Sequence, residues 1–324
     1  MQRRHMLGAM AALASSAYLG KGYAQGAGSS VPLHVVVPFP PGGGTDVLGR
    51  AIGYRLEKLL GRPVVVENKP GASGIVGAEY VAKSDRDGNT LLFSGLVPSV
   101  RYYSRPISQI GAELAPVCMI ARSPYLVAVN PGVPAKTLGE FVQLARSKPG
   151  TLTFGSPGNA TPQHLATERF RSQVGIDILH VPYRGTGPMM TDLLGGQIQL
   201  VFATVAAAEQ HVKSGRLRAL AVTSAERLDR LPDVPTVAEA GIADFVAEIA
   251  FGTYVAAGTP AAAIGGLNRA INQALADGDV RGKLVEQGFI PVGGAPADLE
   301  KSLLAEVKAV SELVRSGKVR IDAA

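Results

Sequence analysis

Short apolar runs alternate with amphipathic segments along most of the chain. The run 33–37 is rich in β-branched residues, and in 46–60 apolar residues recur at helical spacing. Further strands are predicted at 64–67, 90–94, 125–130, 151–154, 178–181, 198–203, 217–223 and 251–256, and helices are predicted between and after them. This alternation predicts an α/β fold with mixed sheets of mainly parallel type.

The alternation occurs as two similar units followed by a helical tail. The runs 125–130 and 251–256 stand where the chain passes from one unit to the other and back. We therefore expect two lobes joined by crossing hinge strands. The first lobe is expected to contain 31–125 and 250–324, and the second 126–249.

The N-terminus has the pattern of an export signal. Arg3 and Arg4 precede an apolar run at 6–19, and small residues follow up to Ala24. The run is shorter than the roughly 20 apolar residues of a membrane span. We expect residues 1–24 to be a signal peptide and the mature protein to be periplasmic. The arginine pair faintly resembles a twin-arginine signal, so the general secretory and twin-arginine routes both stay open.

Charge and cysteine content argue against a nucleic-acid-binding protein and against an internal disulfide. The formal charge is +6, but Arg3, Arg4 and Lys21 lie in or beside the predicted signal, so the rest of the chain is only mildly basic. No cluster of basic residues with interleaved aromatics is present, which argues against nucleic acid as a partner. The single cysteine, Cys118, cannot form an internal disulfide.

A glycine-rich loop follows the first predicted strand and leads directly into a helix. Glycines allow close approach to backbone amides, and a helix N-terminus attracts anions. The candidate ligand-binding residues are Phe39, Gly43, Gly44, Thr45 and Asp46. The alternative is a tight turn with Thr45 as a helix cap. Nucleotide fingerprints fail here, because position 47 is not glycine and no lysine follows Gly44.

The same order of strand, small-residue loop and helix start recurs at 154–164. Thr161 is a suitable N-cap, and a proline occupies the first helical position. The candidate residues are Ser156, Gly158, Asn159, Thr161 and His164. The alternative is a capped loop with a packed histidine.

A third strand leads into a helix start at 181–188. Tyr183 can donate a hydrogen bond, and Arg184 can pair with an anion, although a surface arginine without such a role is an open alternative. Ala203 ends a strand expected at the same edge and is a candidate for the cavity wall. If two lobes turn these helix starts toward one cleft, they form a converging anion site.

Two chemical alternatives are open at the second loop. A secreted serine hydrolase using Ser156 and His164 lacks the nucleophile-elbow pattern and an obvious carboxylate to orient the histidine. A metal site at His164 and Glu168 has only two ligands. We therefore predict no metal, no cofactor and no catalytic residue. An interaction protein with a vestigial cleft is the remaining alternative.

The motifs in this order resemble those of the Bug family, the TctC-type receptors of tripartite tricarboxylate transporters. The motifs are VPF at 37–39, GGGTD at 42–46, VENKPGASG at 66–74, FGSPG at 154–158, HL at 164–165, VPYRG at 181–185, DLLGGQ at 192–197, LAVTS at 220–224, LPDVPT at 231–236 and AGTP at 257–260.

The resemblance implies a type II periplasmic binding fold, of the Venus-flytrap kind, that is not an enzyme. Such receptors bind small carboxylates and deliver them to membrane transporter subunits or to a sensor kinase. The resemblance also implies that the loops at 39–46 and 156–164 hold the ligand carboxylate. Pro40, Pro41 and the Ala250-Phe251 pair depart from the usual family pattern, so the sequence does not name the carboxylate.

Overall fold

The computed structural model describes residues 31–95 and 113–315. Its strands are β1 Leu33–Val37, β2 Val64–Asn68, β3 Thr90–Gly95, β4 Leu114–Val129, β5 Thr153–Ser156, β6 Leu179–Pro182, β7 Leu200–Thr204, β8 Arg218–Val222, β9 Glu248–Ala256 and β10 Ile290–Pro291. The predicted signal peptide lies outside the described residues.

Helices connect most of these strands. They are α2 Gly44–Leu60, the short 3₁₀ turn η1 Ala72–Gly74, α3 Ile75–Ala82, α4 Leu138–Ser147, α5 Pro162–Val174, α6 Thr186–Leu194, α7 Val205–Lys213, α8 Ala261–Ala276, α9 Gly278–Glu286 and α10 Pro296–Arg315. Within the part of the chain that the structure describes, no helix combines the length and apolar character needed to cross a bilayer.

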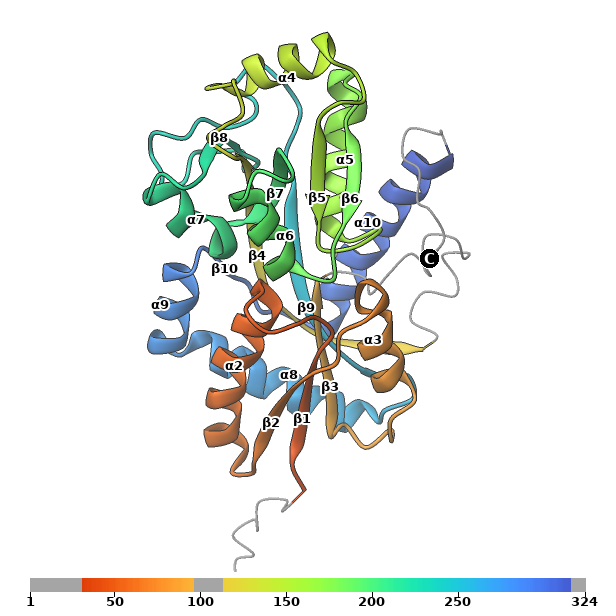
Figure 1. The fold of residues 1–324 in the computed structure, drawn as a ribbon. Coiled ribbons are helices and arrows are strands. Elements are labelled where there is room, and N and C mark those ends of the chain that lie inside the picture. Colours follow the sequence, from red (N-terminus) through yellow and green to blue (C-terminus); the bar gives the residue numbers. More distant parts are fainter. Residues whose placement is uncertain (1–30, 96–112, 316–324) are drawn as a thin grey trace, which may run out of the picture.

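The strands form two lobes that share β4 (Figure 1). In the described residues the sheet runs β2-β1-β3-β9-β4-β7-β5-β6, and β8 and β10 also pair with β4. The β1, β2 and β3 strands are parallel to one another, as are β5, β6 and β7, while β4 and β9 run antiparallel to their neighbours. The two expected sheets are therefore joined into one, because β4 takes part in both.

The β4 strand is longer than the sequence pattern predicts. Residues Leu114 to Pro124 pair with β9 in the first lobe, and Tyr125 to Val129 pair with β7 and β8 in the second. The expected strand covered only 125–130, whereas the observed strand also contains Pro116 and Pro124, residues that cannot donate to a sheet ladder. Here a register shift next to Pro116 and the passage between the lobes at Pro124 accommodate both prolines.

Local sequence explains how α2 is placed against the first sheet. Leu48, Ile52 and Leu56 are fully buried on its inner face. A Cβ atom on Gly49 would lie 3.0 Å from a methyl carbon of Val37, so the glycine lets the helix approach β1 closely. The helix then ends at a left-handed Gly61. As a result, the N-terminus of α2 lies at the carboxyl end of β1, facing the second lobe (Figure 1).

Candidate ligand-binding site

Two adjoining cavities lie where loops of the two lobes meet. The inner cavity, with about 40 Å³ of free space, is lined by Phe39, Gly43, Gly44, Thr45, Ser73, Ser94, Gly95, Pro157, Ala160, Thr161, Pro162, Gln163, Thr186, Thr204, Ile249 and Phe251. The outer cavity is wider, at about 650 Å³, and shares Phe39, Ser73 and Pro157 with the inner one. A molecule held in the inner cavity can therefore extend into the outer one.

The inner cavity is surrounded by the N-termini of four helices. Gly43 precedes α2, Thr161 precedes α5, and Thr204 precedes α7, while Thr186 is the first residue of α6. All four residues line the cavity. The first backbone N–H groups of a helix have no partner within the helix, and they carry a partial positive charge.

Three of these four helix starts have no side-chain cap. Thr161 accepts a hydrogen bond from the backbone N–H of His164 at 3.4 Å, which caps α5. The residues preceding α2, α6 and α7 make no such bond. Their first amide groups are thus available to an acceptor that enters the cavity.

The remaining lining is made of hydroxyl groups, apolar groups and Gln163. Thr45, Ser73 and Ser94 contribute hydroxyls, while Ile249 and Phe251 contribute apolar surface. None of the described residues that line the inner cavity has an ionisable side chain. An anion held there would be stabilised by helix dipoles and by charge-assisted hydrogen bonds from neutral donors, without an ion pair.

The outer cavity contains the third predicted motif. Tyr183 and Arg184 both line it. The Tyr183 hydroxyl donates to Asp192 Oδ2 at 2.7 Å, and burial together with that bond raises the pKa of Tyr183 to about 12. Arg184 is exposed and makes no ion pair with another described residue. It is therefore the cationic group of this cavity that is available to a ligand.

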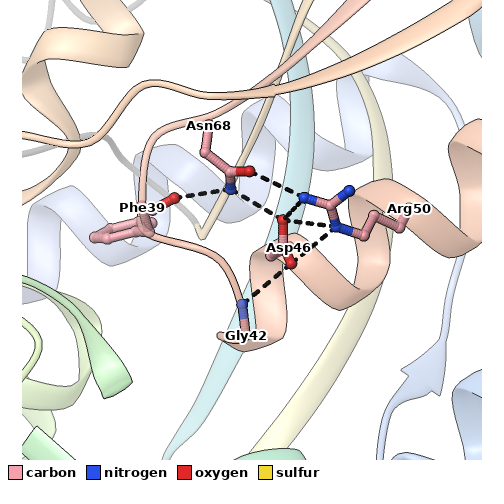
Figure 2. Close-up of polar contacts among 5 residues, drawn as sticks. All are labelled: Phe39, Gly42, Asp46, Arg50 and Asn68. Carbon is pink, nitrogen blue, oxygen red and sulfur yellow. Dashed lines mark hydrogen bonds and ion pairs between the residues drawn. The ribbon is translucent and has the colours of Figure 1, made fainter. Parts of the chain in front are cut away.

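Asp46 supports the first loop from behind (Figure 2). Its carboxylate accepts from the Gly42 N–H at 3.1 Å, from Asn68 Nδ2 at 2.9 Å and from Arg50 Nε at 3.0 Å. Asn68 also donates to the Phe39 carbonyl at 3.0 Å. Burial alone would raise the pKa of Asp46, but the hydrogen bonds from Arg50, Asn68 and Gly42 lower it overall. Asp46 lines neither cavity, because its carboxylate is used inside the loop.

Ser156 and His164 also lie behind the cavity surface. Ser156 is fully buried, and its hydroxyl lies 2.7 Å from His180 Nε2. The His164 ring accepts a hydrogen bond from the backbone N–H of Ala160 at 2.9 Å through Nδ1. The structure therefore does not pair Ser156 with His164, and a buried hydroxyl is not placed to attack a substrate. The hydrolase alternative is not supported.

The predicted site residues divide into three groups. Those that line the inner cavity are Phe39, Gly43, Gly44, Thr45 and Thr161, and those that line the outer cavity are Phe39, Gly158, Asn159, Tyr183 and Arg184. Those that line neither are Asp46, Ser156, His164 and Ala203. The four outside the lining are all at most 5% exposed, so their side chains pack into the protein instead of facing the ligand space.

Sequence reasoning missed several lining residues. Thr204 is the last residue of β7 and precedes α7; the end of this strand was expected at the cavity wall, but Ala203 was the residue chosen as the candidate. Its neighbour Ala203 packs in the core of the second lobe, because successive strand residues point to opposite faces. Ser94 and Phe251 carried no local signal, since the pairing of β3 with β9 brings them to the cavity. Among the described residues, no group of three or more metal-binding side chains gathers.

Sequence comparison places the chain among transporter receptors. Residues 48–319 match the family model described as the tripartite tricarboxylate transporter family receptor. The chain is also 36% identical over 294 residues to the protein BugT of Bordetella pertussis, which covers 88% of this chain and 88% of BugT.

Solved structures of two similar proteins contain carboxylates. A Rhodopseudomonas palustris protein solved with adipate is 32% identical, with a TM-score of 0.81 over 88% of this chain and 96% of that one. MatC of the same organism, solved with bound malate, is 30% identical, with a TM-score of 0.80 over 88% of this chain and 99% of that one.

Proposed function

Because this chain belongs to the tripartite tricarboxylate transporter receptor family, we propose that it binds one small carboxylate in the inner cavity between its lobes. The ligand carboxylate takes the place of the missing caps at the starts of α2, α6 and α7. The remainder of the ligand extends past Phe39 and Ser73 toward Arg184 in the outer cavity.

One observation carries this proposal: four helix N-termini meet at one small cavity, and three of them have no side-chain cap. A neutral ligand would leave their amide groups without a strong acceptor inside a closed space, which costs free energy. A carboxylate accepts several N–H bonds at once, and each charge-assisted bond contributes about 1.5–3 kcal/mol. The site therefore favours an anion although no cation lines it.

The neighbours solved with adipate and malate support the same chemistry, because both ligands are small carboxylic acids. The Ile249 and Phe251 wall provides apolar contact for a hydrocarbon part of the ligand. The predicted site residues that line the two cavities are proposed as ligand contacts. Asp46, Ser156 and His164 are proposed to support them from behind.

Binding is proposed to lead to transport or sensing, without chemical conversion of the ligand. The protein is exported by a signal peptide at residues 1–24 and acts in the periplasm. Its lobes close by bending at β4 and β9, the strands that connect them. The closed receptor then docks on membrane transporter subunits or on a sensor kinase.

The test is calorimetric titration and thermal unfolding of the mature chain with a panel of small carboxylates, with the matching amides as controls. We expect at least one acid to bind and to raise the free energy of unfolding by about 2.7 kcal/mol at one hundred times its dissociation constant. The amides lack the negative charge, so they should bind at least about a hundredfold more weakly. Equal binding of an acid and its amide would contradict the proposed anion site.

A further inference from the structure

A stack of three rings lies directly behind the second-lobe side of the inner cavity. His164 and His180 stack with their ring centres 3.8 Å apart and their planes 11° apart. Phe154 stacks on His180 at 4.9 Å. His164 is 3% exposed and Phe154 is fully buried. The rings come from β5, α5 and β6, so the stack joins three neighbouring elements of the lobe.

Each histidine holds one part of the loop at 156–161. His164 Nδ1 accepts from the Ala160 N–H at 2.9 Å. His180 Nε2 lies 2.7 Å from Ser156 Oγ, which in turn bonds the Gly158 carbonyl at 2.9 Å. The same stretch of chain carries Ala160 and Thr161 on the inner cavity and Gly158 on the outer one.

The loop is strained where it is held. Ala160 has a φ of 52°, in the left-handed region that an alanine rarely occupies, and its side chain is 2% exposed. Strained backbone persists only where the surroundings impose it, and it concentrates at functional sites. The hydrogen bond to His164 is one such constraint, because it requires the Ala160 N–H to point at the ring.

The hydrogen bond from Ala160 also determines where the neutral His164 ring carries its proton. His164 Nδ1 accepts, so its proton is on Nε2. Ser156 Oγ lies within hydrogen-bond distance of both the Gly158 carbonyl and His180 Nε2, and the direction of its bond to His180 depends on the tautomer of that ring. Burial, followed by the nearby charges of His180 and Arg171, lowers the pKa of His164 to about 3. The acceptor at Nδ1 is therefore kept at neutral pH.

We propose that His164 and His180 are positioning residues that hold the loop at 156–161 in the conformation needed by the ligand, without touching the ligand themselves. This inference rests on the proposed carboxylate site. Without the stack, Ala160 relaxes toward ordinary backbone angles, and the ligand must reorder the loop on binding. The apparent affinity then falls in proportion to the fraction of molecules that keep the ordered loop.

Matched variants separate the hydrogen bonds from the packing. His164→Phe and His180→Phe keep a ring in the stack but lose the bonds, whereas His164→Asn and His180→Gln keep a polar atom near Nδ1 or Nε2. Two quantities are measured: amide hydrogen exchange of residues 156–161 without ligand, and adipate and malate affinity by calorimetry. Urea unfolding monitors global stability. Ser156→Ala, a smaller change, tests the His180 bond if a phenylalanine variant fails to fold.

We expect the phenylalanine variants and Ser156→Ala to exchange the loop amides at least about tenfold faster and to bind the acids at least about tenfold more weakly. The Asn and Gln variants should stay within about threefold of the parent. Ser156→Ala combined with His180→Phe should lose no more than Ser156→Ala alone, because removal of the hydroxyl already removes its bond to His180.

Unchanged loop exchange in the phenylalanine variants and in Ser156→Ala would overturn the inference. The inference would also be overturned if the loss of affinity only followed the loss of global stability. The same holds if the Asn and Gln variants lost as much affinity as the phenylalanine variants. If the parent binds no carboxylate but the loop amides of the phenylalanine variants exchange faster, the proposed function is wrong. The role of the histidines in holding the loop is then still supported.

Discussion

At the scale of single residues, the polar side chains nearest the cavity divide into those that face it and those that hold its walls. Asp46 bonds the loop before α2, and His164 bonds the loop before α5. Each satisfies a backbone N–H of its own loop, so neither is left for a ligand. In the proposed site, the ligand-facing groups are then backbone amides and hydroxyls such as those of Thr45, Ser73 and Ser94.

The low pKa of His164 predicts a specific pH dependence of stability. The unfolded chain binds a proton at this histidine near pH 6.5, whereas the folded protein binds it only near pH 3. The contribution of neutral His164 to the free energy of unfolding is therefore present above pH 6.5. This contribution is lost as the pH falls toward 3. Between pH 7 and pH 5 the loss is roughly 2 kcal/mol.

Urea unfolding of the parent and of His164→Asn at pH 7 and pH 5 checks this prediction. The variant has no titrating group at this position, so its stability should fall by roughly 2 kcal/mol less than that of the parent. An equal fall in the two proteins would show that His164 is not buried in its neutral form.

At the scale of elements, one unit is repeated around the cavity: a strand, a short loop and the start of a helix. The unit occurs at β1–α2, β5–α5, β6–α6 and β7–α7, and the carboxyl ends of the strands bring all four helix starts together. An uncapped helix start is unfavourable in an isolated element. Under the proposed function, the ligand supplies the missing acceptor at the three uncapped starts.

A carboxylate built into the protein should therefore compete with the ligand. Thr204→Asp places an acidic N-cap at the start of α7. Its carboxylate accepts hydrogen bonds from the free backbone amides and repels the carboxylate of the ligand. We expect carboxylate affinity to fall at least about tenfold. The control is Thr137→Asp at the exposed N-cap of α4, which lies away from both cavities and should keep affinity within about twofold.

Calorimetry with the same acids measures both variants, and urea unfolding shows whether each is folded. Full carboxylate affinity in folded Thr204→Asp would mean that the start of α7 takes no part in binding.

At the scale of the whole molecule, the two lobes are already in contact through their ligand loops. A Cβ atom on Gly185 would lie 2.8 Å from Pro40 Cδ, and one on Gly158 would lie 2.5 Å from Ser73 Oγ. Pro40 and Ser73 belong to the first lobe, and the two glycines to the second. The structure is thus a closed form, and exchange of ligand with solvent requires the loops to separate.

A disulfide between the lobes should hold this closed form. A Cβ atom on Gly43 would lie 3.8 Å from the Thr186 Cβ, which equals the mean Cβ separation of protein disulfides. Gly43 has a φ of −82°, so it accepts a side chain without strain. In the double variant Gly43→Cys, Thr186→Cys, we expect oxidation to slow carboxylate association at least about a hundredfold and reduction to restore it.

Stopped-flow or calorimetric binding with and without reductant measures the effect, and each single-cysteine variant serves as a control. The native Cys118 should not interfere, because burial raises the pKa of its thiol to about 12. Failure of the two new cysteines to pair would show that the lobes do not approach this closely in solution.

The sequence by itself determined the local structure and the family. Helical periodicity predicted a helix at 46–60, which the structure has as α2 Gly44–Leu60, and Thr161 caps α5 as expected. The glycine-rich turns after the strands and the order of the motifs indicated a two-lobed carboxylate receptor. These features depend on interactions between residues close together in the chain, so they can be read from it directly.

Only the tertiary structure decided which groups face the ligand. Sheet pairing brings Phe251 on β9 beside Gly95 on β3, and it extends β4 through both lobes. The β5–β6 pairing places His180 beside Phe154, and His180 stacks on His164 of α5, so a predicted ligand contact lies behind the cavity wall. These contacts join residues far apart in the chain. Their geometry depends on strand register and on how the lobes close, which local propensity does not encode.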